Sequence, residues 1–364
     1  MDLTFNITED TPQGKFDNSF VITAVCLILI SISAVAGNLL VLAAIVIKRN
    51  LRTISDLYLA NLAVADLMQA ALAIPLRATV LLGIRKQQAP VPCSVVIFFT
   101  ILFGGVSNMS ILLVGVDRFI AIKWPFTYHT WLTTKVFVSS VILTWSSMFL
   151  FAASPLVGWG RSDNPTLSRT CRFTMTLDRT YVAIGYIFIH GLPLITIVIV
   201  YFFILKASFR HSRAIAAQEF SLQSNNSQLK EDSFTREELR TTGCQGHTEN
   251  FSNSHTEQPH ARMRNHVRNT SKTGKGARMI AILIGVFILL VLPIVVIDVV
   301  EMWEQPSAPP IVVNIAICLI YANSGVNVFI YAGWNAEYRR NFHRILLSLW
   351  KLTVKWFETN QEDS

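Results

Sequence analysis

An acid and a base stand side by side in the apolar stretch LLVGVDRFIAIKWPF, residues 112–126. Asp117 and Arg118 are adjacent there, with apolar runs on both sides. Charged side chains are expensive in hydrocarbon, so a charged pair in a membrane segment usually has a task. The pair suits the solvated edge of a soluble helix, a buried ion pair, or a switch held at a membrane surface.

A second group of polar residues lies within other apolar stretches. Asp66 is its only acid, and hydroxyl or amide side chains from other stretches could face the carboxylate. A carboxylate surrounded by such oxygens suits a small hard cation with some water. The alternative is a structural hydrogen-bond network that holds helices together, which we favour for Asn38 alone. The partners proposed for Asp66 are Ser107, Asn323, Ser324 and Asn327.

Seven apolar segments are long enough to carry these residues across a bilayer, since a helix needs about 20 apolar residues for this. Of the 364 residues, 52% are hydrophobic and only 15% are charged, whereas soluble domains carry about 25% charged residues. The sequence therefore predicts an all-α membrane protein, a seven-transmembrane helix bundle over residues 20–334. The predicted spans are residues 20–48, 55–83, 93–122, 135–158, 181–208, 278–303 and 310–333.

Basic residues predict how the chain is oriented. Lys15 is the only Lys or Arg before the first span, whereas Lys48, Arg49 and Arg52 follow it closely. The positive-inside rule then places the N-terminal residues 1–19 outside the cell and the C-terminus inside. The net charge of +8 is mainly explained by this topology, so nucleic acid is not an expected partner.

Three segments on the inner side lie outside the spans. The third intracellular loop, residues 209–277, is rich in polar residues over most of its length and is expected to be disordered. Residues 335–350 place aromatic and apolar residues at helical spacing with Arg and His between them. This pattern predicts an amphipathic helix that contacts lipids of the inner leaflet, with a plain solvated helix as the alternative. Residues 351–364 are expected to form a cytoplasmic tail.

Two features of the predicted outer face concern covalent chemistry. Cys93 opens the third span and Cys171 lies in the loop before the fifth, both on the oxidising side. A disulfide between them is expected, and two free thiols are the alternative. Of the N-x-Ser/Thr sequons, only the one at Asn6 lies outside and away from the membrane, so Asn6 is the predicted glycosylation site.

The ordered set of motifs resembles the rhodopsin-like (class A) G-protein-coupled receptors over about residues 20–350. The matches are GNLLVL in the first span, LANLAVADL in the second, VDRFIAIKWPFTY at the end of the third and NSGVNVFIY in the seventh. Trp145, Pro193 and Pro293 match in the spans between.

The resemblance implies a multi-pass plasma-membrane receptor that is not an enzyme. It would bind an extracellular small molecule in the outer half of the bundle. Outward movement of the sixth span would then activate a heterotrimeric G protein. The resemblance also implies arrestin and receptor kinases as partners of the third loop, and no cofactor beyond an allosteric Na⁺ at Asp66 and its four partners.

The same resemblance assigns the switch. Arg118 would make the switch contact, Asp117 would hold it at rest, and Tyr201 and Tyr331 would approach it in the active state. An acid often opens the sixth span to pair with this arginine, and Thr273 stands there instead. This departure predicts raised basal activity.

Two further departures lie in the sixth and seventh spans. Val291 replaces the family tryptophan, and Val328 replaces the proline after the seventh-span Asn.

The ligand class is constrained mainly by exclusion. Residues 305–334 contain no Lys for retinal, and residues 93–116 contain no acid for a monoamine. The remainder looks most similar to adenosine and melatonin receptors, which favours a nucleoside-like or indoleamine-like ligand. The alternatives are a peptide or another ligand and, more remotely, a transporter or channel. The predicted pocket residues are Thr100, Phe103, Phe173, His190, Ile294, Asp298, Glu301 and Tyr321.

Three of these pocket residues have alternative interpretations. Asp298 and Glu301 could favour a cationic or donor-rich ligand, or they could be solvated acids at the outer end of the helix. His190 could face the ligand, or it could make a hydrogen bond to a neighbouring helix.

Overall fold

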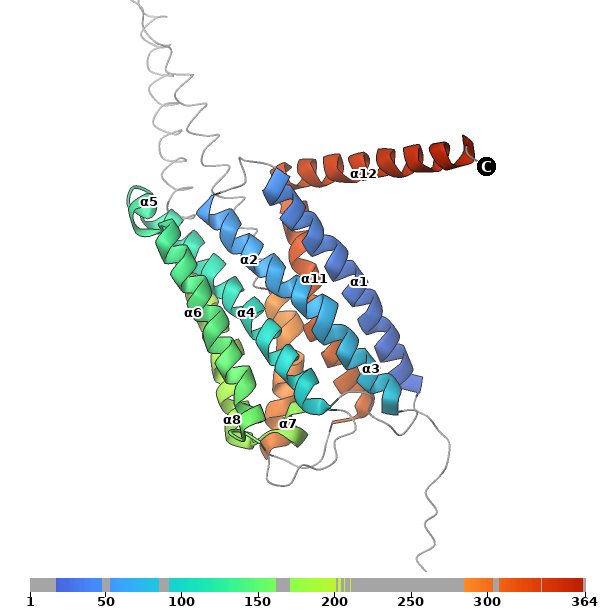
Figure 1. Cartoon of the computed structure of the whole chain (residues 1–364). Helices are drawn as coiled ribbons and strands as arrows, with labels where there is room; N and C mark the ends of the chain where they lie inside the picture. The colour runs from blue at the N-terminus through green and yellow to red at the C-terminus, as the bar shows by residue number, and fades with distance from the viewer. Residues whose placement is uncertain are drawn as a thin grey trace, which may run out of the picture.

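The computed structural model describes residues 18–47, 53–84, 92–161, 171–200, 285–303, 308–334 and 336–362, together with residues 202, 203, 206 and 210. Within these residues, seven helices are long and apolar enough to cross a membrane. They lie side by side as one bundle (Figure 1). The predicted all-α, seven-helix fold is confirmed.

The first three spans contribute most of the buried polar residues. They are α1, Asn18–Ile47; α2 and α3, Ile54–Met68 and Ile74–Ile84, joined by a π-helical turn, Gln69–Ala73; and α4, Cys93–Lys123. Helix α2 begins in a capping box, in which the Thr53 side chain accepts from the Asp56 backbone N–H and the Asp56 side chain accepts from the Thr53 N–H. This reciprocal pair satisfies backbone donors that the first helical turn leaves free.

The remaining spans complete the bundle. They are α6, Thr134–Ala153, with a 3₁₀ turn at Ser154–Val157; α8, Arg179–Gly185, with a π-helical turn at Tyr186–Gly191 and further helix to Val200; Gly285–Trp303; and α11, Pro310–Trp334. Two short helices connect them, α5, Tyr128–Trp131, and α7, Phe173–Thr176. Helix α5 lies at one end of the bundle and α7 at the other (Figure 1).

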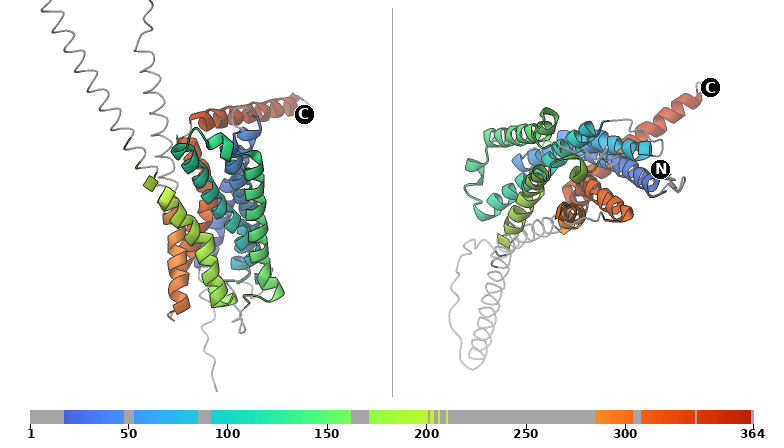
Figure 2. Two further views of the ribbon diagram at one scale, coloured as in Figure 1. Left: turned by 90° about the vertical axis from the view of Figure 1, so that its left-hand side faces the viewer. Right: turned by 90° about the horizontal axis from the view of Figure 1, so that it is seen from below.

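Helix α12, Ala336–Glu362, runs across the end of the bundle that also carries α5 (Figure 2). Tyr338 and Phe342 on its first turns are buried, and the Tyr338 hydroxyl donates to Asp56 at 3.0 Å. Leu346 and Trp350 are exposed. The helix continues beyond residue 350, where the sequence analysis placed the start of a tail, because residues 351–362 contain neither Gly nor Pro.

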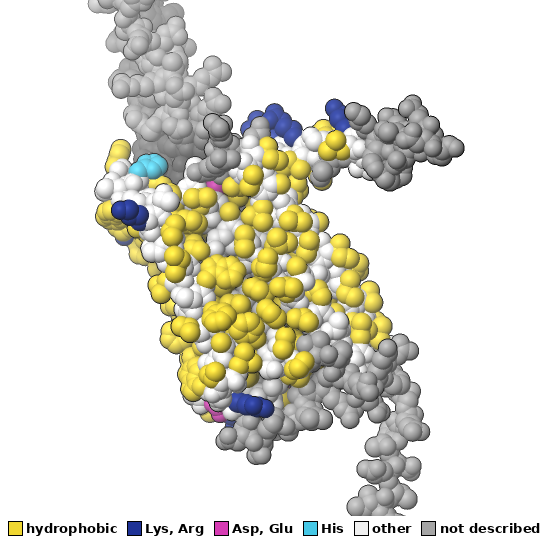
Figure 3. All heavy atoms as spheres, viewed as in Figure 1, with side chains coloured by type: hydrophobic (Ala, Val, Ile, Leu, Met, Phe, Trp, Pro, Cys, Tyr) yellow, Lys and Arg dark blue, Asp and Glu magenta, His cyan; other side chains and the backbone are white. Residues whose placement is uncertain are grey.

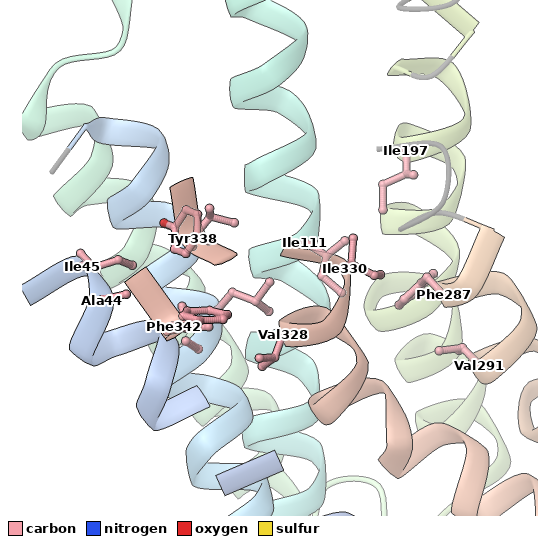
Figure 4. Packing of buried hydrophobic residues seen from close by; sticks show 14 of the residues in the cluster. Ala44, Ile45, Ile111, Ile197, Phe287, Val291, Val328, Ile330, Tyr338 and Phe342 are labelled. Atoms are coloured by element: carbon pink, nitrogen blue, oxygen red, sulfur yellow. The ribbon is translucent and has the colours of Figure 1, made fainter. Parts of the chain in front are cut away.

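Apolar packing fills the centre of the bundle. One cluster joins α1, α4, α11, α12 and the fifth and sixth spans, and includes Val291 and Val328 (Figure 4). A Cβ on Gly37 would lie only 3.0–3.2 Å from the Val328 side chain, so α1 and α11 approach closely at this point. Large apolar side chains also cover the outer face of the bundle (Figure 3). This surface suits contact with lipid tails rather than water.

Candidate functional site

A cavity of about 1110 Å³, including space open to solvent, lies between the spans near the end that carries α7. Both π-helical turns border it: Gln69 belongs to the first, and Tyr186 and His190 to the second. π-Helical turns are rare and occur often at functional sites, because the extra residue redirects the side chains that follow. A mostly apolar cavity with a few polar groups is typical of a small-molecule site.

Most of the predicted pocket residues line this cavity. They are Thr100, Phe173, His190, Ile294, Asp298 and Tyr321.

Phe103 does not line the cavity, contrary to the prediction. Its ring stacks on Phe99 at 5.6 Å and meets the edge of Trp145 at 6.4 Å between centroids. It therefore points into the interface between α4 and α6. Helical spacing placed it near Thr100 in sequence but not on the face that the cavity occupies.

Glu301 also lies outside the cavity wall, and neither it nor Asp298 is a solvated acid. Arg172 pairs with both, donating from Nη1 to Glu301 Oε1 at 2.8 Å and from Nη2 to Asp298 Oδ1 at 2.9 Å. All three side chains are buried, and the Tyr186 hydroxyl donates to Asp298. Burial lowers the pKa of Arg172, but hydrogen bonds to Glu301 and Asp298 raise it by more, so the net shift is upward. The acids are thus already neutralised in part, which weakens the expectation of a cationic ligand.

Arg77 was not among the predicted pocket residues, but it lines the cavity and is 6% exposed. Its Nη1 donates to the carbonyl oxygen of Cys171 at 3.0 Å. The signal was present in the sequence, since Arg77 is a basic residue inside an otherwise apolar span, IPLRATVLL.

The loop that carries Arg172 is fastened to α4. Cys93 and Cys171 form the predicted disulfide, with Cα atoms 5.2 Å apart. The bond holds Arg172 and Phe173 over the cavity, because both residues directly follow Cys171 in the chain.

His190 lies deeper in the cavity. Its Nδ1 is 3.1 Å from the side-chain amide nitrogen of Asn108, so the hydrogen bond to a neighbouring helix is present. His190 also lines the cavity, so both interpretations of this residue hold together.

Asp66 lies on α2, three residues before Gln69 of the cavity wall, and is fully buried. Its two carboxylate oxygens accept from Ser107 Oγ at 2.6 Å and from Asn327 Nδ2 at 2.9 Å. Ser324 donates to Gln69 Oε1 at 3.1 Å and also interacts with Asp66. Among the described residues, Asn323 makes no hydrogen bond to Asp66 and lies on the cavity wall instead. The hydrogen-bond network, the alternative to a cation site, is therefore present.

Asn38 takes part in this region through the backbone. Its amide donates to the carbonyl oxygens of Ala34 and Ser324, each at 2.9 Å. These bonds tie α1 to α11, which is the structural role favoured for Asn38 from the sequence.

Asp117 and Arg118 lie on α4 near the opposite end of the bundle. Arg118 Nε is 3.1 Å from Asp117 Oδ2, and the arginine side chain is 35% exposed whereas the aspartate is buried. Ser55 Oγ donates to Asp117 Oδ2 at 2.6 Å, and the Tyr128 hydroxyl donates to Oδ1 at 2.7 Å. The carboxylate of Asp117 is therefore held by Ser55 and Tyr128 as well as by Arg118, and neither of these two partners was predicted from the sequence.

Some predicted residues fall outside the described part of the chain. These are Asn6, Tyr201 and Thr273, most of the loop at 209–277, and the side chain of Tyr331.

Comparison with known families gives this arrangement its context. The family model described as "7 transmembrane receptor (rhodopsin family)" matches residues 37–331. The chain belongs to this receptor family. Receptors of the family are not enzymes, and as seven-helix proteins they are multi-pass membrane proteins, so this receptor is one as well.

Its curated relatives include receptors for different ligands at similar identity. The receptor is 27% identical to octopamine receptor beta-2R of Drosophila melanogaster, over 91% of this chain and 62% of the relative. It is 26% identical to the D(1A) dopamine receptor of Xenopus laevis, over 94% and 77% of the two chains. It is also 26% identical to adenosine receptor A2b of Rattus norvegicus, over 88% of each chain.

Proposed function

We propose that this receptor binds an extracellular small molecule in the cavity and activates a heterotrimeric G protein at the opposite end of the bundle. The observation that carries the proposal is that one helix, α4, connects the two sites. Thr100 lines the cavity, and Arg118 pairs with Asp117 at the other end of the same helix. A rise of 1.5 Å per residue places them about 27 Å apart along the helix.

Ligand binding would act by population shift. A ligand that binds better to the form with the sixth span moved outward favours that form by its difference in affinity. In the resting form Asp117 holds Arg118, and on activation Arg118 is released toward the G protein, with Tyr201 and Tyr331 as its new neighbours. The proposed ligand is a flat aromatic molecule, nucleoside-like or indoleamine-like, for which Phe173 offers a ring at the cavity wall.

The Asp66 group is proposed to hold Na⁺ in the resting form. One carboxylate with hydroxyl and amide oxygens nearby is a donor set that a hard cation accepts, so the residues fit the ion. Bound there, Na⁺ would supply positive charge beside Asp66. The residues concerned are Asp66, Ser107, Asn323, Ser324 and Asn327. Thermal stability should then be higher in NaCl than in KCl, and Asp66→Asn should remove the difference.

The remaining proposals concern the surroundings of the receptor. We place it in the plasma membrane with its N-terminus outside, Asn6 glycosylated and the C-terminus in the cytoplasm. Helix α12 would lie on inner-leaflet lipids, and arrestin and receptor kinases would act on the third loop. Loss of an electrophoretic shift in Asn6→Gln would support the orientation.

A ligand panel tests the central proposal. Nucleosides, indoleamines, biogenic amines and peptides are applied to cells that express the receptor, with second messengers as the readout. Arg118→Ala at matched surface expression is expected to abolish agonist-driven signalling. Intact signalling in Arg118→Ala would reject the switch assignment, and ligand-driven solute flux through purified protein would favour a transporter.

A further inference from the structure

Arg77 is a buried cation on the cavity wall that forms no direct ion pair among the described residues. It belongs to α3, and its side chain is 6% exposed. In the part of the chain that the structure describes, the ion pairs are made by Arg118 and Arg172, and Arg77 makes one hydrogen bond, to the carbonyl oxygen of Cys171. A positive charge thus borders the cavity with a single, neutral hydrogen-bond acceptor, while Asp298 attracts it and Arg172 repels it only through space.

Such a charge is strongly unfavourable unless something compensates it. A carbonyl oxygen recovers only part of the hydration that a guanidinium loses on burial. Ionisable residues inside membrane spans are rare, and they mark ligand or ion pathways. A negative charge on a bound ligand would supply the missing compensation.

The charged residues around the cavity also indicate how many negative charges the bound ligand carries. Two carboxylates, Asp298 and Glu301, share the single guanidinium of Arg172, which leaves one excess negative charge beside the sixth span. Arg77 on α3 forms an ion pair with neither of these acids among the described residues, and its hydrogen bond goes to a neutral carbonyl oxygen. A dianion such as a phosphate monoester would be repelled by the excess negative charge, whereas a monoanion matches Arg77 alone.

We propose that the ligand carries a carboxylate, and that the Arg77 guanidinium binds it through two parallel N–H···O hydrogen bonds. The planar fork of N–H groups on arginine matches the two oxygens of a carboxylate. Thr100 and Tyr321 lie on the same cavity wall with their hydroxyl oxygens 3.1 Å apart, within reach as further donors. The inference rests on the cavity being the ligand pocket, as proposed above. It keeps the flat aromatic body proposed there and replaces the ribose of a nucleoside or the amine of an indoleamine by a carboxylate.

The rest of the cavity wall indicates the body of this ligand. Val96, Ile97, Ile294 and Ile317 present apolar side chains, and Phe173 adds an aromatic ring. Burial of an apolar or aromatic body against these side chains contributes free energy of binding in proportion to its area. The ligand class is therefore an aromatic monocarboxylate.

A purely structural role for Arg77 makes a different prediction. Its bond to Cys171 could serve only to fasten the loop. Arg77→Gln keeps an N–H donor for that carbonyl and removes the charge, so it separates the two roles. Arg77→Lys keeps the charge and loses the fork. Arg179→Gln removes an exposed arginine outside the cavity and is the matched control.

The test uses the full-length receptor, purified in detergent, with indole-3-acetate as the probe and indole-3-acetamide as its uncharged analogue. Binding to the folded state raises the thermal midpoint in a dose-dependent way, from which an affinity follows. Indole-3-acetate is expected to stabilise the wild type at lower concentrations than the amide does. Arg77→Gln should weaken its binding about tenfold or more, because charge-assisted hydrogen bonds are lost. Amide binding and the Arg179→Gln variant should match the wild type.

Three results would overturn the proposal. The first is that indole-3-acetate and indole-3-acetamide shift the thermal midpoint of the wild type equally, or that neither shifts it. The second is that Arg77→Gln binds indole-3-acetate as tightly as the wild type does. The third is that Arg77→Lys binds it as tightly as the wild type does. The Lys variant carries the comparison if Arg77→Gln does not fold, and it should bind the acid several-fold more weakly.

A second-messenger assay distinguishes this proposal from the receptor function on which it rests. A carboxylate that binds through Arg77 without G-protein activation contradicts the proposed function and leaves the recognition intact. An agonist without a carboxylate, equally potent on Arg77→Gln and the wild type, supports the receptor function and contradicts carboxylate recognition.

Discussion

At the scale of single residues, Asp117 shows how a buried charge is held by distant parts of the chain. It accepts from Ser55 at the start of α2 and from Tyr128 in α5, besides its neighbour Arg118. Burial and, to a smaller extent, the interaction with Asp117 raise the pKa of Tyr128 to about 12, and the hydrogen bond to Ser55 opposes this shift. The phenol therefore stays protonated at physiological pH and remains a donor to the carboxylate.

Replacing Tyr128 by Phe is expected to raise basal signalling. The change removes one hydrogen bond to a charged group, which contributes about 1.5–3 kcal/mol. Since the bond is proposed to favour the resting form, the ratio of active to resting receptor should rise by about tenfold or more. The measurement is ligand-free second-messenger production at matched surface expression. Tyr58→Phe is the control, since the Tyr58 hydroxyl forms its hydrogen bond with Ser140 and not with Asp117. Equal basal signalling of both variants and the wild type would contradict the proposal that Tyr128 stabilises the resting form.

Arg172 is the second residue of this kind, and its loss should destabilise the folded receptor. Arg172→Met leaves the buried Asp298 and Glu301 without their cation, which costs about 3–5 kcal/mol when a buried pair is broken. The thermal midpoint of the solubilised receptor should fall accordingly. A triple variant that adds Asp298→Asn and Glu301→Gln should recover much of the loss, because no buried charge is then left unpaired. A triple variant no more stable than Arg172→Met would contradict this explanation.

The sequence predicted such residues better than it predicted their partners. Asp117, Arg118 and Asp66 stand out because charges are rare in apolar segments. That Arg172 pairs with Asp298 and Glu301 could not be read from the sequence, because the loop conformation that brings them together depends on the Cys93–Cys171 bond and on the packing of the sixth span. Phe103 was misplaced for a related reason, since a helix that is apolar all round does not reveal which face borders a cavity.

At the scale of elements, polar caps and π-helical turns position the cavity walls. Asp178 precedes α8 and its Oδ2 accepts from the backbone N–H groups of Thr180 and Tyr181 at 2.8 and 3.3 Å. Slight burial raises the pKa of Asp178, but these two donors outweigh it and lower the pKa from its ordinary value. The cap thus fixes the start of the helix that carries Tyr186 into the cavity.

The Asp178 cap should make stability depend on acid pH. Because the pKa is lower in the folded state, the carboxylate stabilises the fold above its ordinary pKa, and this contribution is lost as pH falls toward the folded value. Asp178→Ala should lower the thermal midpoint at neutral pH and narrow its gap to the wild type in acid. Asp178→Asn keeps a capping acceptor without a charge and should show a smaller loss with no such pH dependence. A gap between Ala and wild type that is constant with pH would contradict the ionic contribution.

At the scale of the whole molecule, the bundle follows from hydropathy more directly than its internal contacts do. Length and apolarity of a segment are one-dimensional properties, so the seven helices were predictable. The close approach of α1 and α11 at Gly37 and Val328 depends on which faces meet. Val328 occupies the position of the family proline and packs in the central cluster. Helix α11 therefore keeps a backbone N–H donor at this position, which a proline would remove. It also keeps the apolar contact of the valine side chain.

The balance between resting and active forms is also a property of the whole bundle, and the sequence predicts raised basal activity. Thr273 stands where family members often carry an acid that pairs with the third-span arginine, so Arg118 lacks that second restraint. Thr273→Glu is expected to lower ligand-free signalling by about fivefold at most, the effect of roughly 1 kcal/mol from a partly exposed ion pair. The measurement is basal second-messenger production at matched surface expression, beside cells without receptor. Thr273→Gln is the control for side-chain size without charge. In an Arg118→Ala background, Thr273→Glu should leave basal signalling unchanged, because the new acid then has no arginine to pair with. A wild-type baseline equal to that of cells without receptor, or equal effects of Glu and Gln, would reject the missing restraint as the cause.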